Sequence, residues 1–152
     1  MSMSLDGTLG ITLPSAAAPA FAAYSNVSQS ISAQTNTKVQ FNLKTFDTNS
    51  NYDNTTNYRF TPTVAGYYQI SACVTPGNTN YTNALIYKNG SLAYTGSTSG
   101  SNYAGAAGNI SVLIYFNGST DYVECYIGLQ NSGTLYNTNG WCWFQGVFVR
   151  SA

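Results

Sequence analysis

Histidine is absent from this chain of 152 residues, and charged residues are scarce. Lys and Arg together number five, as do Asp and Glu, so the formal net charge is zero. The absence of histidine excludes Ser-His-Asp and Cys-His nucleophiles and argues against a zinc site. The lack of a basic stripe argues against nucleic-acid binding, because such binding depends on Lys and Arg contacts with phosphates.

Long apolar runs are also missing, so we expect no membrane insertion. The opening, MSMSLDGTLG, lacks the basic end and the apolar middle of a signal peptide, and we expect a protein that is used without a secretion signal. The Gly-rich segment GSTSGSNYAGAAG has neither the Lys nor the strand–helix setting of a phosphate-binding loop. We therefore expect no cofactor.

Cysteine occurs only at Cys73, Cys125 and Cys142, and no two of these form a CxxC pair. Each lies inside an apolar run with the composition of a strand. This setting predicts buried free thiols that pack as small hydrophobic side chains.

Helix signals are nearly missing as well. Only SAAAPAFAA is rich in Ala, and Pro19 interrupts it before a helix of stable length can form. Strand signals recur instead, in segments rich in Tyr, Phe, Val, Ile and Thr. We expect strands within residues 21–25, 39–46, 58–62, 66–74, 84–95, 109–116, 121–130 and 141–150.

Turn signals divide these segments. Asn89-Gly90 accepts positive φ at both positions of a tight hairpin turn, and residues 117–120 form a similar, longer turn. The pattern predicts an all-β fold, an antiparallel β-sandwich jelly roll of about eight to ten strands. We expect this domain over residues 20–152. Residues 1–19 are too few to form a core, and we expect a linker or the remnant of a stalk there.

Two of the expected strands carry apolar or aromatic side chains on both faces. A sandwich buries only one face of each sheet, so the second face needs another cover. We expect a neighbouring subunit there, in a homotrimer. The candidate interface residues are Tyr67, Trp143 and Val147.

Phe60, Gly66, Tyr68 and Ile70 follow a pattern of an aromatic residue, five residues, glycine and alternating apolar positions. The segments FAAYS, KVQFNLKTFDTNSNYDNTTNYRF, YKNGSL, LIYFNGSTDYVECY and FQGVFV accompany it in chain order. Together they resemble the globular head domain of complement C1q, in the C1q/tumour-necrosis-factor jelly-roll superfamily. The chain departs from the family at Ala65, where Pro is frequent, and in the stretched turn at residues 118–121.

The resemblance implies three jelly rolls around a threefold axis, with the strands that hold Cys73 and Cys142 antiparallel neighbours. We expect both thiols to stay reduced, because assembly inside a cell occurs at a reducing potential. Some members of the resembled family bind calcium, and Asp47 and Asp53 are the candidate ligands here. The alternative is that both carboxylates brace a turn through hydrogen bonds, since calcium takes about six or more oxygen ligands.

The segment SLDGTLGITLP is similar to segments of bacteriophage tail and fibre proteins that often precede a C-terminal knob. This likeness implies a knob on a phage virion, assembled in the host cytoplasm, that contacts other virion proteins through its N-terminal segment. We expect it to bind a host-surface receptor, either a glycan or a protein. A purely structural head-fibre or capsid-decoration knob is the alternative.

A glycan-cleaving enzyme is a further alternative, and it would need two carboxylates on either side of the cleaved bond. Asp121 and Glu124 are three residues apart on an expected strand and therefore point to opposite faces. We do not expect an enzyme.

Three long connections, at residues 75–83, 96–108 and 131–140, are expected at the end of the domain away from the stalk. They mix Tyr with Asn, Ser, Thr and Gly, a composition typical of antibody loops. Tyr rings stack on sugar faces and Asn amides bond paired hydroxyls, which fits a glycan. The candidate receptor-binding residues are Tyr81, Asn83, Tyr103, Tyr136 and Asn137. The alternative is that these loops only keep the surface soluble.

Overall fold

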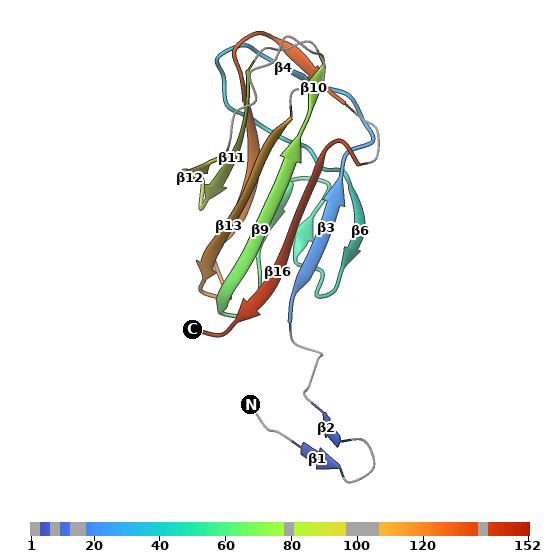
Figure 1. The fold of residues 1–152 in the computed structure, drawn as a ribbon, viewed down its shortest axis with the longest axis vertical. Coiled ribbons are helices and arrows are strands. Elements are labelled where there is room, and N and C mark those ends of the chain that lie inside the picture. Colours follow the sequence, from blue (N-terminus) through green and yellow to red (C-terminus); the bar gives the residue numbers. More distant parts are fainter. Residues whose placement is uncertain (1–3, 7–9, 13–17, 78–80, 97–106, 137–139) are drawn as a thin grey trace.

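A computed structural model gives the fold and describes residues 4–6, 10–12, 18–77, 81–96, 107–136 and 140–152 (Figure 1). All the regular secondary-structure elements in these residues are β-strands. None of the described residues belongs to a helix long and apolar enough to cross a membrane. The expected all-β class is confirmed, although the described strands are shorter and more numerous than the sequence indicated.

One layer is an antiparallel sheet of five strands, which Figure 1 shows nearly face-on. Its order is β13 (Gly108–Phe116), β9 (Gly66–Val74), β16 (Trp143–Arg150), β3 (Ala20–Tyr24) and β6 (Leu43–Asp47). No two neighbours in this sheet follow one another directly in the chain. Each connection therefore leaves the sheet before the chain returns to it, which is the arrangement of a jelly roll.

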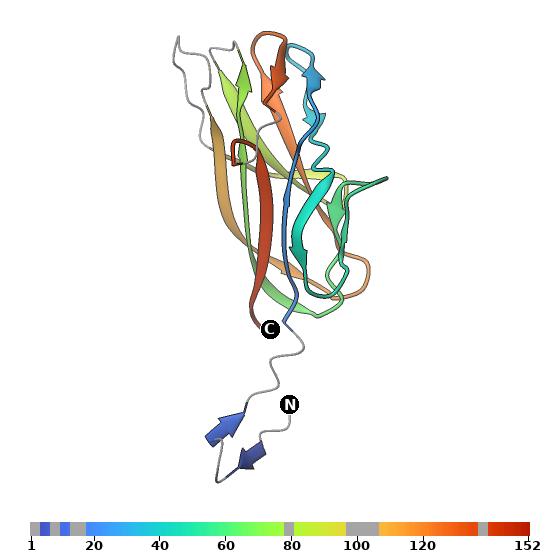
Figure 2. The ribbon, with the colours of Figure 1, turned by 90° about the vertical axis from the view of Figure 1, so that its right-hand side faces the viewer.

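The second layer is a sheet of shorter strands, and Figure 2 shows the two layers from the side. Its order is β12 (Ser91–Thr95), β11 (Thr82–Lys88), β14 (Val123–Leu129), β8 (Arg59–Phe60) and β7 (Tyr52–Asp53), with β5 (Thr37–Lys38) also paired to β14. The longest pairing within this sheet joins β11 to β14 over seven residue pairs. This pair is the centre of the second layer.

A third, small sheet lies at the end of the sandwich away from the C-terminus (Figure 1). It joins β10 (Pro76–Gly77), β15 (Gly133–Leu135) and β4 (Gln29–Ile31). Two of these strands, β10 and β15, lie in segments that were expected to be loops, and β4 was not expected. Runs of two or three residues that contain Pro or Gly carry no strand pattern of their own, and only pairing with distant segments makes them strands.

Two short strands precede the sandwich, β1 (Ser4–Asp6) and β2 (Gly10–Thr12), and they pair with each other. Figure 1 draws this pair apart from the sandwich, on the side where β3 begins. The described pairing joins β1 and β2 to each other. The division of the chain into a linker and a domain stays a prediction.

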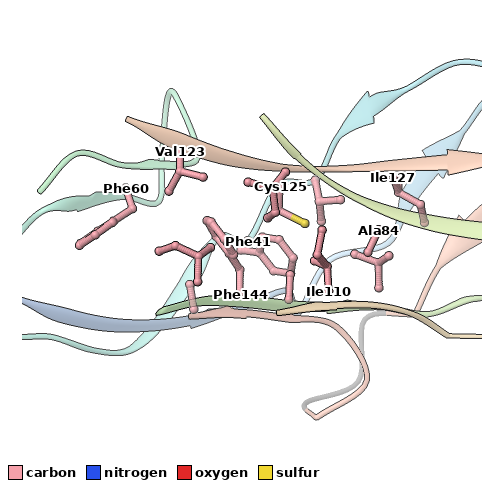
Figure 3. Close-up of a cluster of buried hydrophobic side chains, with 14 of the residues drawn as sticks. Phe41, Phe60, Ala84, Ile110, Val123, Cys125, Ile127 and Phe144 are labelled. Atoms are coloured by element: carbon pink, nitrogen blue, oxygen red, sulfur yellow. The ribbon is translucent and has the colours of Figure 1, made fainter. Parts of the chain in front are cut away.

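Aromatic and aliphatic side chains fill the space between the two main sheets (Figure 3). Phe144 and Ile110 extend from the five-stranded layer toward Val123 and Cys125 of β14. In the same core the rings of Phe21 and Phe60 stack with their centroids 4.3 Å apart. A stacked pair of this kind adds about 0.5–1.5 kcal/mol to the stabilisation that burial of the two rings supplies.

Strand β9 shows the expected alternation. Tyr68 and Ile70 are completely buried, whereas Tyr67 is 37% exposed on the opposite face. Gly66 begins the strand because a Cβ there would lie 2.4 Å from the carbonyl oxygen of Arg150 and 2.6 Å from the ring of Phe148. The end of β16 packs this closely against the start of β9 because residue 66 has no side chain.

The hairpin at Asn89-Gly90 is confirmed. It joins β11 to β12, and its two residues have φ of 53° and 78°. Asn89 also donates from its side-chain amide to Asp121 at 2.8 Å, which holds the hairpin against the turn at residues 117–120. Both short turns therefore lie at the same end of the sandwich.

The expected strand over residues 39–46 is wrong in its first half. Strand β5 ends at Lys38 and β6 begins only at Leu43. Between them the chain crosses from the second layer to the first, because β5 pairs with β14 whereas β6 pairs with β3. Val39 and Phe41 of this crossing segment are completely buried and belong to the core.

We predict that the small third sheet contributes fully to stability. Leu135 of β15 is 2% exposed and belongs to the core, so Leu135→Ala should lower the free energy of unfolding by about 2–5 kcal/mol. Leu92 of β12 is 50% exposed, and Leu92→Ala should change the free energy of unfolding by about 0.5 kcal/mol or less. Urea unfolding of both variants measures the difference, and equal stabilities would show that β15 is not part of the core.

Candidate functional site

The outer face of the five-stranded sheet is open and carries the expected interface residues. Tyr67 of β9 is 37% exposed and Val147 of β16 is 48% exposed on this face. Trp143 lies on the same face of β16 but is only partly exposed, beside Cys73 of β9 and Tyr24 of β3. The structure thus brings the three residues to one surface of the molecule.

Several exposed apolar side chains on this face were not anticipated. We call the whole set the open apolar face; in addition to Tyr67 and Val147 it contains Phe46, Leu113, Tyr115 and Val149. Leu113 and Val149 are more than half exposed, at 52% and 51%. The alternation of residues 109–116 contained the signal, because Leu113 and Tyr115 alternate with the buried Ile114 and Phe116.

The middle of the same face is polar. Gln69 donates to the hydroxyl of Ser111 at 2.8 Å, and the hydroxyls of Ser71 and Ser111 lie 2.7 Å apart. These side chains satisfy one another across β9 and β13, so this band of the sheet needs no partner to complete its hydrogen bonds.

The described ends of the three long connections meet at the end of the sandwich that carries the small third sheet. The pairing of Pro76 with Leu135 joins the first connection to the third. The amide of Gly96 donates to the carbonyl of Ala84 at 2.7 Å, which holds the second connection to β11. Residues 78–80, 97–106 and 137–139 lie outside the described part of the chain, and Tyr103 and Asn137 are among them.

Tyr81 and Asn83 line one groove at this end, on the outer side of β11 and β14. We call it the amide groove; its volume is about 420 Å³, and its lining residues are Gln34, Asn36, Tyr81, Asn83, Gly128, Leu129 and Gln130. Sequence reasoning missed Gln34, Asn36 and Gln130, because they come from segments that meet only in the folded chain.

Tyr136 does not share this groove. Its ring packs edge-on against Trp141 with the centroids 5.1 Å apart, and it lines a separate hollow of about 370 Å³ beside Gly77 and Ser132. The structure therefore brings Tyr81 and Asn83 together, and it places Tyr136 on a different surface of the same end.

The calcium candidates are engaged in hydrogen bonds within their own turns. Asp47 accepts from the backbone amides of Asn51 and Tyr52 at 2.9 and 3.0 Å, and from Lys44. Asp53 accepts from three successive backbone amides at residues 55–57, and these bonds hold the pKa of its carboxyl well below the ordinary value. This geometry favours the turn-bracing role over a metal site.

The second carboxylate pair faces separate partners as well. Asp121 bonds to Asn89 and lies 3.0 Å from the ammonium of Lys88. Glu124 is buried to 4% exposure and pairs with Lys38 on the outer face of β14. Each carboxylate neutralises its own cation, so the two do not form a pair around a common site.

The three thiols are buried and free. Trp143, which follows Cys142, is paired with Cys73 across β16 and β9, as the family resemblance implied. The sulfur of Cys142 also accepts a hydrogen bond from the amide of Thr75 at 3.3 Å. Burial raises the pKa of all three thiols, that of Cys142 to about 11.

No protein-family model matches the sequence, and no curated protein matches it either.

Several solved structures match the fold. Murine APRIL superposes with a TM-score of 0.68 over 87% of this chain and 99% of that chain, at 9% identity. The globular domain of zebrafish complement 1qA gives 0.61 over 88% and 99%, at 16% identity. The vertex protein P5 of PRD1 gives 0.55 over 88% and 96%, also at 16% identity. These likenesses show a TNF/C1q-like jelly roll, which confirms the fold predicted from the sequence motifs.

We predict that the three thiols are reduced and unreactive in the folded protein. A pKa raised above the ordinary value lowers the thiolate fraction near neutral pH, and only the thiolate attacks a disulfide reagent. Ellman's reagent should therefore titrate none of the three in the native protein and all three in concentrated guanidinium. Ser91→Cys, on the exposed strand β12, is the control and should add one thiol that reacts at once. Fewer than three thiols in denaturant without reductant would reveal a disulfide.

Proposed function

We propose that this chain is the trimeric knob of a phage virion protein and that it attaches the particle to a receptor on the host surface. It has no catalytic role in this proposal. Its N-terminal segment joins the knob to other virion proteins. The TNF/C1q-like fold supports the knob, and the likeness to a PRD1 vertex protein and the phage-like N-terminal segment support the virion.

The observation that carries the proposal is the open apolar face. Six large apolar or aromatic side chains on one sheet face are exposed by 37% to 52%. Several large apolar side chains exposed on one sheet face are typical of an interaction site, because exposed apolar area is unfavourable in water. The chain has few charges with which to keep copies apart, so a second copy of the same chain is a suitable cover.

Assembly through this face leaves the end of the sandwich that carries the long connections available. The C-terminus and the start of β3 lie at one end of the sandwich, and the ends of the long connections lie at the other (Figure 1). A knob attached through its N-terminal segment then presents the connections outward. Tyr81, Asn83 and Tyr136 belong to that outward end, and we keep them, with Tyr103 and Asn137, as the receptor-binding candidates.

One observation favours a structural knob as the second candidate. The PRD1 neighbour is a vertex protein, so a jelly roll of similar shape occurs in a protein of that kind. In that case the knob occupies a position on the capsid and binds no receptor. Adsorption to host cells separates the two functions.

We predict that the open apolar face holds the trimer together. Leu113→Glu places a carboxylate where the proposed interface excludes water, and an unpaired charge there is strongly unfavourable. Light scattering on the purified protein at micromolar concentration should give a trimer for the parent chain and a mass about one third as large for Leu113→Glu.

Leu92→Glu is the matched control for this experiment. Leu92 is exposed to the same degree, 50% against 52%, but it lies on β12 of the other sheet. This variant should remain a trimer, and both variants should keep the circular dichroism of the parent. A parent protein that is monomeric, or a Leu113→Glu variant that stays trimeric, would contradict the proposed interface.

We predict that the aromatic side chains at the outward end bind the receptor. Replacement of Tyr81, Tyr103 and Tyr136 together by Ala should remove binding of the labelled protein to host cells. Tyr81 is exposed and Tyr136 is not part of the core, so the trimer mass and the melting temperature should change little. If the triple variant binds cells as well as the parent, the outward end is not the receptor site and the structural knob is favoured.

A further inference from the structure

The amide groove has walls that backbone hydrogen bonds fix in place. The amide of Gln34 donates to the carbonyl of Leu129 at 2.7 Å, which holds the turn between β4 and β5 against β14. The amide of Gln130 donates to the carbonyl of Tyr81 at 3.4 Å, which holds the opposite wall. The groove thus exists before any ligand arrives, and a preformed site loses less entropy on binding.

Gln34 adopts a backbone conformation that residues with a side chain seldom adopt. Its φ is 54°, in the left-handed region where Gly or Asn is usual. Backbone strain of this kind is common at binding sites, where the gain lies in the placement of a side chain. Here the strained residue is one of those that line the groove.

The floor of the groove is open because residue 128 is Gly. Its position on β14 faces outward, like those of Glu124 and Tyr126 on the same strand. A Cβ at Gly128 would lie 2.8 Å from the side-chain oxygen of Asn36. The missing side chain therefore leaves room for the amide of Asn36, which donates to the hydroxyl of Tyr87 at 3.0 Å.

The groove presents amides and no charge. Gln34, Asn83 and Gln130 make no side-chain hydrogen bond to another described residue, so their donors and acceptors are available to a ligand. None of the five Lys and Arg residues and none of the five Asp and Glu residues of the chain lines this groove. An ionised ligand would lose its hydration here without gaining an opposite charge.

Deepening the attachment function proposed above, we propose that the amide groove binds an uncharged saccharide. A primary amide offers two N–H donors and a carbonyl acceptor in one plane, and neighbouring sugar hydroxyls require both kinds of partner. The exposed ring of Tyr81, 42% accessible, supplies an apolar face for the C–H side of a pyranose. The volume of about 420 Å³ is in the range of pockets that hold small ligands.

An array of immobilised oligosaccharides tests the ligand class. It carries uncharged hexose chains beside sialylated and uronic-acid chains, and the labelled trimer is the probe. The parent protein should bind at least one uncharged chain and should show no preference for its acidic counterpart. Binding to acidic chains alone, or to no chain on the array, would overturn the inference.

Two glycine substitutions test the site. Gln34→Gly removes the side-chain amide, keeps the backbone N–H and relieves the strain of the positive φ. The fold should therefore be retained, and the affinity for the bound saccharide should fall about tenfold or more. Ser50→Gly is the matched control, because Ser50 has a φ of 53° and lies outside the groove. It should bind like the parent. Equal affinities of the two variants would place the saccharide elsewhere.

The same reagents separate this inference from the proposed function. If the trimer adsorbs to host cells but Gln34→Gly adsorbs equally well and no uncharged saccharide competes, the groove inference is wrong and attachment stands. If the trimer binds an uncharged saccharide through the groove but adsorbs to no host cell, the ligand class is right and the attachment function is wrong.

Discussion

Strands β9 and β16 run antiparallel inside the five-stranded sheet, and this pairing decides what both faces of the sheet are able to do. On the inner face it aligns Phe144 with Ala72 and Phe148 with Tyr68, which fills the core with a large side chain beside a small one or an edge-on ring. On the outer face it aligns Val147 with Gln69. A shift of one residue would exchange the two faces, since side chains alternate along a strand.

The scarcity of charge shapes the surface as strongly as the core shapes the interior. Three of the five cations form ion pairs, Lys38 with Glu124, Lys44 with Asp47 and Lys88 with Asp121. Arg59 lies over the ring of Tyr122 with its guanidinium carbon 4.4 Å from the centroid. These four cations have their partners within the chain, which is why the proposed recognition of other molecules relies on apolar contact and on amides.

The sequence allowed the fold to be predicted because strong local patterns and global packing agree. The alternation after Gly66 and the Asn89-Gly90 turn are each determined within a few residues of the chain, and the structure contains both. The small third sheet escaped prediction for the opposite reason. Strand β10 consists of Pro76 and Gly77, two residues disfavoured in strands, and pairing with Leu135 and Thr134 overrides that preference.

The candidate site was only partly predictable for a related reason. Tyr81 and Asn83 were found because composition marked their connection as a Tyr- and Asn-rich loop. Gln34 and Gln130 are ordinary polar residues in the sequence, and only the hydrogen bonds that join their segments to β14 and to Tyr81 make them neighbours. Tyr136 was grouped with Tyr81 by composition, but its packing against Trp141 turns it to another hollow.

The two proposed surfaces lie on opposite sides of the sandwich, and this separation links assembly to attachment. The open apolar face belongs to the outer side of β6, β9, β13 and β16, whereas the amide groove belongs to the outer side of β11 and β14. Trimer formation through the first surface leaves the second free in every subunit. A single site that binds one saccharide weakly gains much combined affinity for a dense surface when three copies are held at fixed spacing. Under the two proposals, adsorption to such a surface therefore depends on the trimer, whereas binding of a single soluble saccharide depends on the groove alone.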